Sequence, residues 1–171
     1  PSLTPEGLSE LAEHVNKWSK YSNSLGMRAS FHPHAATYIE TSEETAALFS
    51  KLDENVGLCL DVGHWLVGGG DPVAAVKEYN SRITHVHIKD VDPQVLAKLK
   101  AGKYEGMDIA VNQDKLFAPA GTGALDLDGL LDSLNQVGFS GWLMSEQDSA
   151  WEPSEEKSLE SYRNIERALT T

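Results

Sequence analysis

Five of the six histidines in the sequence, together with several carboxylates, lie at or just beyond the ends of four short apolar runs. These polar segments cover residues 31–34, 60–64, 85–90 and 145–148. Imidazole and carboxylate groups bind divalent zinc, manganese, cobalt or iron, and they do so without a thiolate. The pattern therefore predicts a divalent metal site to which each run contributes one ligand.

The predicted metal ligands are His32, Asp61, His87 and Glu146, one from each segment. His85 and His87 are two residues apart and share one face of a strand, and His87 is chosen because it lies nearer the strand end. Taken alone, a histidine at a strand end usually makes hydrogen bonds only, and Asp61 fits an Asx turn. Four such residues at equivalent positions favour a shared site.

Other residues near these ends allow more than one interpretation. Lys89 and Asp90 could form a surface ion pair that contributes little to stability, and residues 146–148 could be a solvated loop. Trp65, next to a strand end, is a candidate for lining a substrate pocket, whereas Trp142 within a strand is expected in the core.

Strands and helices alternate along the chain in a way that would bring the polar segments together. The apolar runs predict strands at residues 27–31, 56–60, 83–88 and 141–145. Helices are predicted at residues 5–24, 41–52, 71–79, 127–137 and 153–169, with a short one near 95–100. Strands separated by helices build a parallel sheet, and ligands bind at the edge where its carboxyl ends meet. The sequence therefore predicts an α/β fold with about four parallel strands.

Helix start signals support these boundaries. The N-cap and first-turn pairs are Thr4 with Pro5, Asp71 with Pro72, and the capping-box pair Thr41 and Glu44. The connection over residues 90–124 is longer than roughly 15 residues, a length that is usual for functional loops such as lids.

The composition is that of an ordinary globular protein with an acidic surface. Residues 1–171 are enough for one sizeable core, so a single domain is expected. The formal net charge of −12, from 14 Lys and Arg against 26 Asp and Glu, disfavours nucleic acids and anionic membranes as partners. No run approaches the roughly 18 apolar residues of a membrane span, and no secretory signal opens the chain.

The lone Cys59 excludes an intrachain disulfide and a cysteine-rich zinc site. A cytoplasmic location fits these features. The chain starts with Pro1 rather than methionine, as expected of a processed product or a fragment.

Several segments resemble the xylose-isomerase-like TIM-barrel superfamily, which contains proteins of the sugar phosphate isomerase/epimerase type. These segments are residues 32–40, 58–64, 85–91, 119–123 and 141–148. The resemblance extends from about residue 27 to about residue 169. Within the superfamily it is greatest to the inosose dehydratase group, which removes water from a keto-inositol.

The resemblance implies a metal held at the ends of four strands by Asp61, His87, Glu146 and the residue of the first strand, with His64 contacting the substrate. In the epimerases of the superfamily the first-strand ligand is a glutamate, and two metal-bound glutamates take and return a proton. This chain has His32 at that position, which puts a two-glutamate epimerisation in doubt and favours a dehydratase.

A complete (β/α)8 TIM barrel takes about 250 residues and eight strands. Four predicted strands therefore correspond to a partial barrel, the C-terminal half, with two open sheet edges that must be covered. We expect a homo-oligomer or a separate partner chain to complete the barrel. Otherwise the chain is a folded half without activity.

The resulting hypothesis is a divalent-metal-dependent isomerase, epimerase or dehydratase that acts on a sugar, ketose or cyclitol. The metal, Mn, Co, Zn or Mg, would polarise a carbonyl and acidify the adjacent C–H. Glu146 is the first candidate base, and His64 or Lys89 could act instead or protonate a leaving hydroxide. The candidate substrate contacts are His34, His64, Trp65 and Lys89.

Two other classes of protein stay open. The same barrel superfamily includes DNA-repair endonucleases with three-metal sites rich in His, Asp and Glu, although the acidic charge counts against that class. The other is a non-catalytic half-barrel that acts only on assembly.

Overall fold

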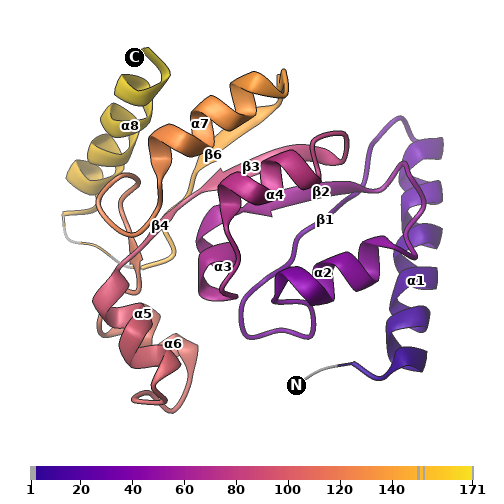
Figure 1. Cartoon of the computed structure of the whole chain (residues 1–171), viewed down its shortest axis with the longest axis horizontal. Helices are drawn as coiled ribbons and strands as arrows, with labels where there is room; N and C mark the ends of the chain where they lie inside the picture. The colour runs from indigo at the N-terminus through magenta and orange to yellow at the C-terminus, as the bar shows by residue number, and fades with distance from the viewer. Residues whose placement is uncertain (1–2, 150, 152, 171) are drawn as a thin grey trace.

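A parallel sheet forms the centre of the computed structural model, which describes residues 3–149, 151 and 153–170 (Figure 1). Its strands, in their order across the sheet, are β1 (Ser30–Phe31), β2 (Gly57–Asp61), β3 (Ile83–Ile88) and β6 (Trp142–Ser145). Each pairing between neighbours in this sheet is parallel. The predicted α/β class with four parallel strands is confirmed, although β1 is shorter than the strand predicted over residues 27–31.

The main helices lie close to their predicted positions, and Figure 1 shows α4, α7 and α8 following one another along the sheet. They are α1 (Pro5–Ser24), α2 (Ser42–Phe49), α4 (Pro72–Glu78), α7 (Leu127–Gln136) and α8 (Ser154–Thr170). Thr4 and Asp71 cap their helices as predicted. The capping box between Thr41 and Glu44 is also present, with both reciprocal hydrogen bonds. The start signals therefore fix the helix boundaries well.

One face of the sheet is apolar and packs against helices. Leu58, Leu60, Val86 and Ile88 are fully buried and alternate along β2 and β3. They form one hydrophobic cluster with Val76 of α4 and with the leucines of α7. A slip of one residue in either strand would turn these side chains to the other face, so their burial fixes the register.

The opposite face of the sheet carries polar residues. Cys59 and Asp61 of β2 are paired in register with His85 and His87 of β3, and all four point to this face. Trp142 of β6 is paired with His85 and is 72% exposed, so the prediction that it lies in the core is wrong. The reason is that, among the described residues, no helix or strand packs over the polar face of the sheet at β6.

The long connection after β3 folds into a small insertion instead of an open loop. A two-stranded antiparallel sheet closes its base, and the chain between those two strands forms two short helices. The elements are β4 (Asp90–Val91), α5 (Pro93–Lys100), α6 (Met107–Asn112) and β5 (Phe117–Ala118). Figure 1 shows α5 and α6 side by side at one end of the molecule. Their apolar residues pack against Ala35 and Val67 of the main body, which attaches the insertion to the side of the sheet that carries the polar segments.

Asp90 anchors the loop that follows the insertion. Its side chain is completely buried, which rules out the alternative in which Lys89 and Asp90 form a surface ion pair. One carboxylate oxygen accepts the backbone N–H groups of Val91 and Leu125, each at 2.8 Å. The other oxygen accepts those of Gly121 and Gly123, at 3.0 and 2.8 Å. Four N–H donors thus converge on one buried carboxylate.

Replacing Asp90 with Asn is expected to lower the free energy of unfolding by about 1–3 kcal/mol, because an amide offers only one oxygen to four buried donors. Urea denaturation measures this loss. Asp92→Asn is the matched control, since Asp92 caps α5 and Asn caps helices equally well, with an expected change below about 0.5 kcal/mol. Equal stability of the two variants would contradict the anchoring role.

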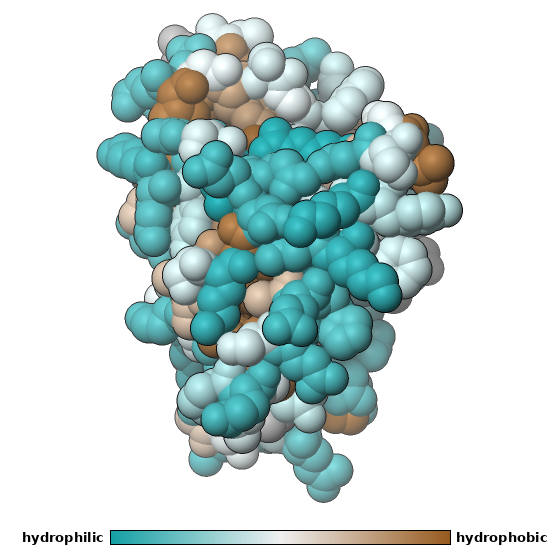
Figure 2. Space-filling model, turned by 90° about the vertical axis from the view of Figure 1, so that its right-hand side faces the viewer, coloured by the Kyte–Doolittle hydropathy of each residue, from teal (hydrophilic) through white to brown (hydrophobic). Residues whose placement is uncertain are grey.

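Figure 2 turns the side of the molecule next to α1 towards the reader and shows a mostly hydrophilic surface with small, separate hydrophobic patches. Trp18, Tyr21 and Leu25, towards the end of α1, are each more than half exposed. None of the helices in the described part of the chain is long and apolar enough to cross a membrane.

Candidate metal centre

The four predicted ligands come together at the carboxyl end of the sheet. Asp61 Oδ2 lies 3.6 Å from His32 Nε2 and 3.4 Å from His87 Nδ1. His87 Nδ1 is also 2.6 Å from Glu146 Oε2. The strand tips thus converge, as the sequence predicts for residues at the ends of adjacent parallel strands.

Four buried atoms of these residues, His32 Nε2, Asp61 Oδ2, His87 Nδ1 and Glu146 Oε2, face one another and, within the described residues, form ion pairs but no well-oriented hydrogen bond. Buried polar atoms are normally hydrogen-bonded, because leaving one without a partner costs about 1–3 kcal/mol. A divalent cation could bind Asp61, His87 and Glu146, whose ligand atoms all lie within 4.8 Å of one another, and His32 Nε2 lies 3.6 Å from the same Asp61. Two imidazoles with two carboxylates form a donor set suited to Zn²⁺, Mn²⁺ or Co²⁺. The residues therefore fit a metal ion.

Local structure sets the position of each ligand. Asp61 ends β2 and caps α3 (Val62–Val67), because its Oδ1 accepts the backbone N–H of His64 at 2.9 Å, which leaves Oδ2 free to face the cluster. Helix α3 is not among the predicted helices, and an Asx turn at Asp61 was only one interpretation of its first residues. Glu146 N–H donates to the carbonyl of Ile88 at 3.1 Å, which extends the β3–β6 pairing and brings Glu146 beside His87.

Lys89 supplies a buried positive charge beside the metal ligands. Its side chain is 1% exposed, and Nζ lies 3.0 Å from Asp61, 3.2 Å from Glu146 and 2.6 Å from Asp148. Burial by itself would lower the pKa of Lys89, but Asp61 and Asp148 outweigh it and raise the pKa above its ordinary value. Lys89 is therefore a cation that holds three carboxylates together.

Gly63 and Phe117, neither of which carries a charge, border the Lys89 side chain. A Cβ atom on Gly63 would lie 2.2 Å from Lys89 Cγ, so only glycine leaves space for the lysine stem. The ring of Phe117, from β5 of the insertion, has its centroid 5.0 Å from Lys89 Nζ. The insertion thus contributes directly to the walls of the site.

Two further histidines border the cluster. His64 is 2% exposed, and its Nε2 lies 3.4 Å from Lys89 Nζ and 3.5 Å from Asp148 Oδ2. Burial lowers the pKa of His64, and the contact with Asp148 offsets part of that effect. The His34 ring stacks on His64 with 3.6 Å between ring centroids. The structure therefore brings His34, His64 and Lys89 next to the metal ligands, as predicted.

The charges in the cluster favour ionised carboxylates. Burial would raise the pKa of Asp61, but its contacts with His32 and His87 and the charge of Lys89 lower it well below its usual range. The pKa of Asp148 is lowered to about 2, first by His64 and then by Lys89. Asp61 is therefore negatively charged, the state that its predicted role as a metal ligand requires.

Trp65 is the one predicted site residue that the structure does not bring into the cluster. Its side chain is 4% exposed and belongs to the main hydrophobic cluster, with its ring 6.1 Å from that of Tyr79. Its position in α3 turns it towards the core, whereas His64, one residue earlier, faces the metal ligands. Trp65 is therefore a core residue.

Asp148 and Phe117 are site residues that the sequence did not single out. Asp148 lies two residues after Glu146, and this spacing could have identified it. Phe117 carries no such signal, because only the antiparallel pairing of β4 with β5 brings it to the site.

Comparison with known proteins agrees with this fold. The family model described as xylose isomerase-like TIM barrel matches residues 2–168. A zinc-bound structure of the IOLI protein has a TM-score of 0.72 at 21% identity, over 98% of this chain and 58% of that one. D-allulose 3-epimerase from Methylomonas sp. has a TM-score of 0.73 at 16% identity, over 99% of this chain and 58% of that one. The fold is therefore that of part of a TIM barrel.

Curated relatives share more of the sequence. The rhizopine catabolism protein MocC of Rhizobium meliloti is 37% identical over 139 residues, which cover 81% of this chain and 40% of the relative. An inosose dehydratase of Clostridium botulinum (strain Alaska E43 / Type E3) is 36% identical over 137 residues, or 80% of this chain and 45% of the relative. The chain spans about half the length of the curated relatives it matches. With a match over nearly all of its length and strands arranged as in a partial barrel, the chain belongs to the xylose isomerase-like TIM barrel family.

Proposed function

We propose that this chain carries the metal centre of a divalent-metal-dependent lyase or isomerase that acts on a sugar, ketose or cyclitol. Dehydration of an inosose is the first candidate reaction. The observation that carries the proposal is the convergence of two imidazoles and two carboxylates, through buried atoms, at the carboxyl end of the sheet. The names of the relatives, inosose dehydratases and a sugar epimerase, support the substrate class.

In this proposal His32, Asp61, His87 and Glu146 hold the cation. A bound divalent cation acts as a Lewis acid, which polarises a substrate carbonyl and makes the neighbouring C–H more acidic. Zinc, manganese, cobalt and magnesium are all candidates, and the ligand set does not choose among them.

Glu146 is the proposed general base. Its side chain is 37% exposed, compared with 31% for His32, 23% for His87 and 0% for Asp61, so among the four ligands it is the most open to a substrate. A carboxylate within reach of the substrate can take the proton from the carbon beside the carbonyl.

Lys89 and His64, which lie beside Asp148 within the same cluster, suit a different task. Because Lys89 keeps its proton, it can donate a hydrogen bond to a substrate oxygen or help a hydroxide to leave. His64 and His34 form a stacked pair beside it that would contact the substrate. These roles favour elimination of water over epimerisation, since His32 stands where a second proton-transferring carboxylate would be needed.

We also propose that the site works within a complete barrel. In the described part of the chain, β1 and β6 each have one side without a strand partner, and Trp142 and Met144 are exposed beside β6. Strands from a second copy or from another chain would cover these edges. The substrate class also favours a cytoplasmic location.

Incubation of the chain with 2-keto-myo-inositol tests the proposed function. With Mn²⁺ or Co²⁺ we expect a product lighter by one water, detected by mass spectrometry, and none after EDTA treatment. The solution mass of the same sample shows whether a barrel has assembled. A product of unchanged mass would show that the enzyme is an isomerase and not a dehydratase. No metal-dependent turnover by an assembled, metal-loaded sample would contradict the proposal.

A further inference from the structure

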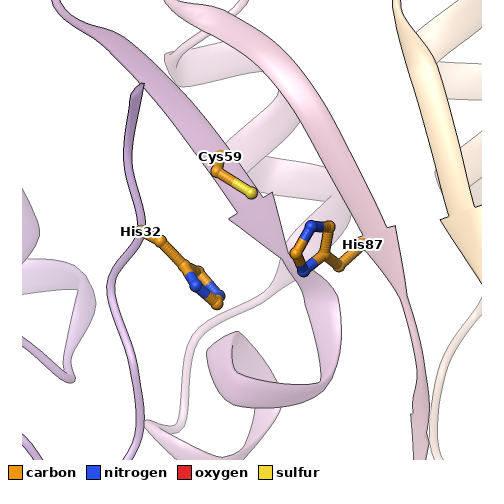
Figure 3. Close-up of side chains that lie close together, drawn as sticks. All are labelled: His32, Cys59 and His87. Atoms are coloured by element: carbon orange, nitrogen blue, oxygen red, sulfur yellow. The ribbon is translucent and has the colours of Figure 1, made fainter. Parts of the chain in front are cut away.

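The single cysteine of the chain lies beside the metal centre, in a place that the proposed mechanism does not use. His32, Cys59 and His87 each offer one ligand atom, and these atoms all lie within 4.8 Å of one another. Figure 3 shows the three side chains pointing into the same space from the segment after β1, from β2 and from β3. The sequence excluded a cysteine-rich site, but it did not exclude one sulfur ligand.

The alternation of β2 explains this arrangement. Cys59 and Asp61 are two residues apart, so their side chains share the polar face of the sheet, and they are paired with His85 and His87. His32 and His87 form one group of potential ligands with Cys59. His32 also belongs to a group with Asp61 and His64, and His87 to a group with Asp61 and Glu146.

A second observation points to a cation at this position. The Asp61 side chain is completely buried, and its Oδ2 forms an ion pair with Lys89 Nζ at 3.0 Å but no well-oriented hydrogen bond among the described residues. That oxygen faces His32 Nε2 and His87 Nδ1, the same two imidazoles that border Cys59. A fully buried carboxylate oxygen that faces two imidazoles as well as the ammonium group of Lys89 lies where a metal ion could bind the carboxylate and both imidazoles.

We propose that Cys59 is a ligand of the bound ion and makes the centre prefer thiophilic cations, Zn²⁺ or Co²⁺, over Mn²⁺ and Mg²⁺. The inference rests on the metal centre of the proposed function. Soft thiolate ligands favour zinc, whereas carboxylate and water favour magnesium and manganese. On binding, the S–H bond breaks, a metal–sulfur bond forms and the proton passes to water.

A buried cysteine more often acts as a small apolar residue. Cys59 differs from that case in its surroundings, because the apolar face of β2 carries Leu58 and Leu60 while Cys59 points to the face with the histidines.

Titration of the whole chain with Co²⁺ tests the proposal independently of activity. In the wild type we expect visible d–d absorption together with a sulfur-to-cobalt charge-transfer band in the near ultraviolet. Because the sequence has one cysteine, that band can only come from Cys59. In Cys59→Ser the visible bands should persist and the charge-transfer band should disappear.

Metal affinities give the second measurement. Loss of a ligand should weaken Zn²⁺ binding to Cys59→Ser by about tenfold or more, while Mn²⁺ binding changes by less than about twofold. Cys59→Ala controls for the added hydroxyl and should behave in the same way, with circular dichroism confirming that both variants fold. Cobalt binding in the wild type without a charge-transfer band would overturn the role of Cys59 and leave the metal centre intact. No cobalt binding at all would overturn both.

Discussion

The Glu146→Gln variant is expected to turn over an inosose-type substrate about 10²–10⁴-fold more slowly than the wild type. Glutamine keeps the shape of the side chain and one oxygen that can face the metal, but it cannot accept a proton. Glu146 is also the most exposed of the four ligands, so the substrate reaches it more easily than it reaches Asp61. Steady-state rates at saturating Mn²⁺ measure the loss.

The metal content of the variant must be measured alongside the rate, because a weakened site would also slow the reaction. Glu54→Gln is the matched control, since Glu54 is exposed before β2, and its rate should stay within about twofold of the wild type because surface substitutions seldom matter. Unchanged turnover in Glu146→Gln would remove Glu146 from the mechanism.

Replacing Lys89 with Met is expected to destabilise the metal-free chain by about 3–5 kcal/mol, because it removes one partner of a buried ion cluster. Methionine fills similar space, but it leaves the carboxylates of Asp61, Glu146 and Asp148 without the cation that they surround. Urea unfolding in the presence of EDTA measures the effect. Added Zn²⁺ should restore part of the lost stability, since a bound cation again balances these charges.

Lys98→Met is the control for this experiment. Lys98 forms an ion pair with Asp114 at 3.4 Å, but both side chains are largely exposed, so the expected loss is at most about 1 kcal/mol. If Lys89→Met unfolded at the same urea concentration as Lys98→Met, the buried lysine would not hold the site together.

Local sequence rules predicted much of this fold. Thr4, Asp71 and the pair Thr41–Glu44 cap helices as expected, because capping depends on residues three or four positions apart. The meeting of His32, Asp61, His87 and Glu146 was also predictable. Parallel strands end at one edge of a sheet, so polar residues at equivalent strand ends must lie close together.

Predictions failed where the answer depends on residues far apart in the chain. Lys89 and Asp90 have the composition of a surface pair, but three carboxylates and four backbone N–H groups, most of them distant in sequence, surround them inside the protein. Trp142 lies in β6, which among the described residues has a strand partner on one side only, so its position in a strand did not bury it. Phe117 reaches the site only through the long insertion.

Zinc-edge anomalous diffraction from crystals of the chain grown with Zn²⁺ most directly tests whether four strand ends share one cation. We expect one peak per chain, about 2.0–2.2 Å from an imidazole nitrogen of His32 and of His87 and from a carboxylate oxygen of Asp61 and of Glu146, and the proposed role of Cys59 adds its sulfur at about 2.3 Å. Peaks bound only by surface carboxylates, or no peak among these four side chains, would contradict the metal centre.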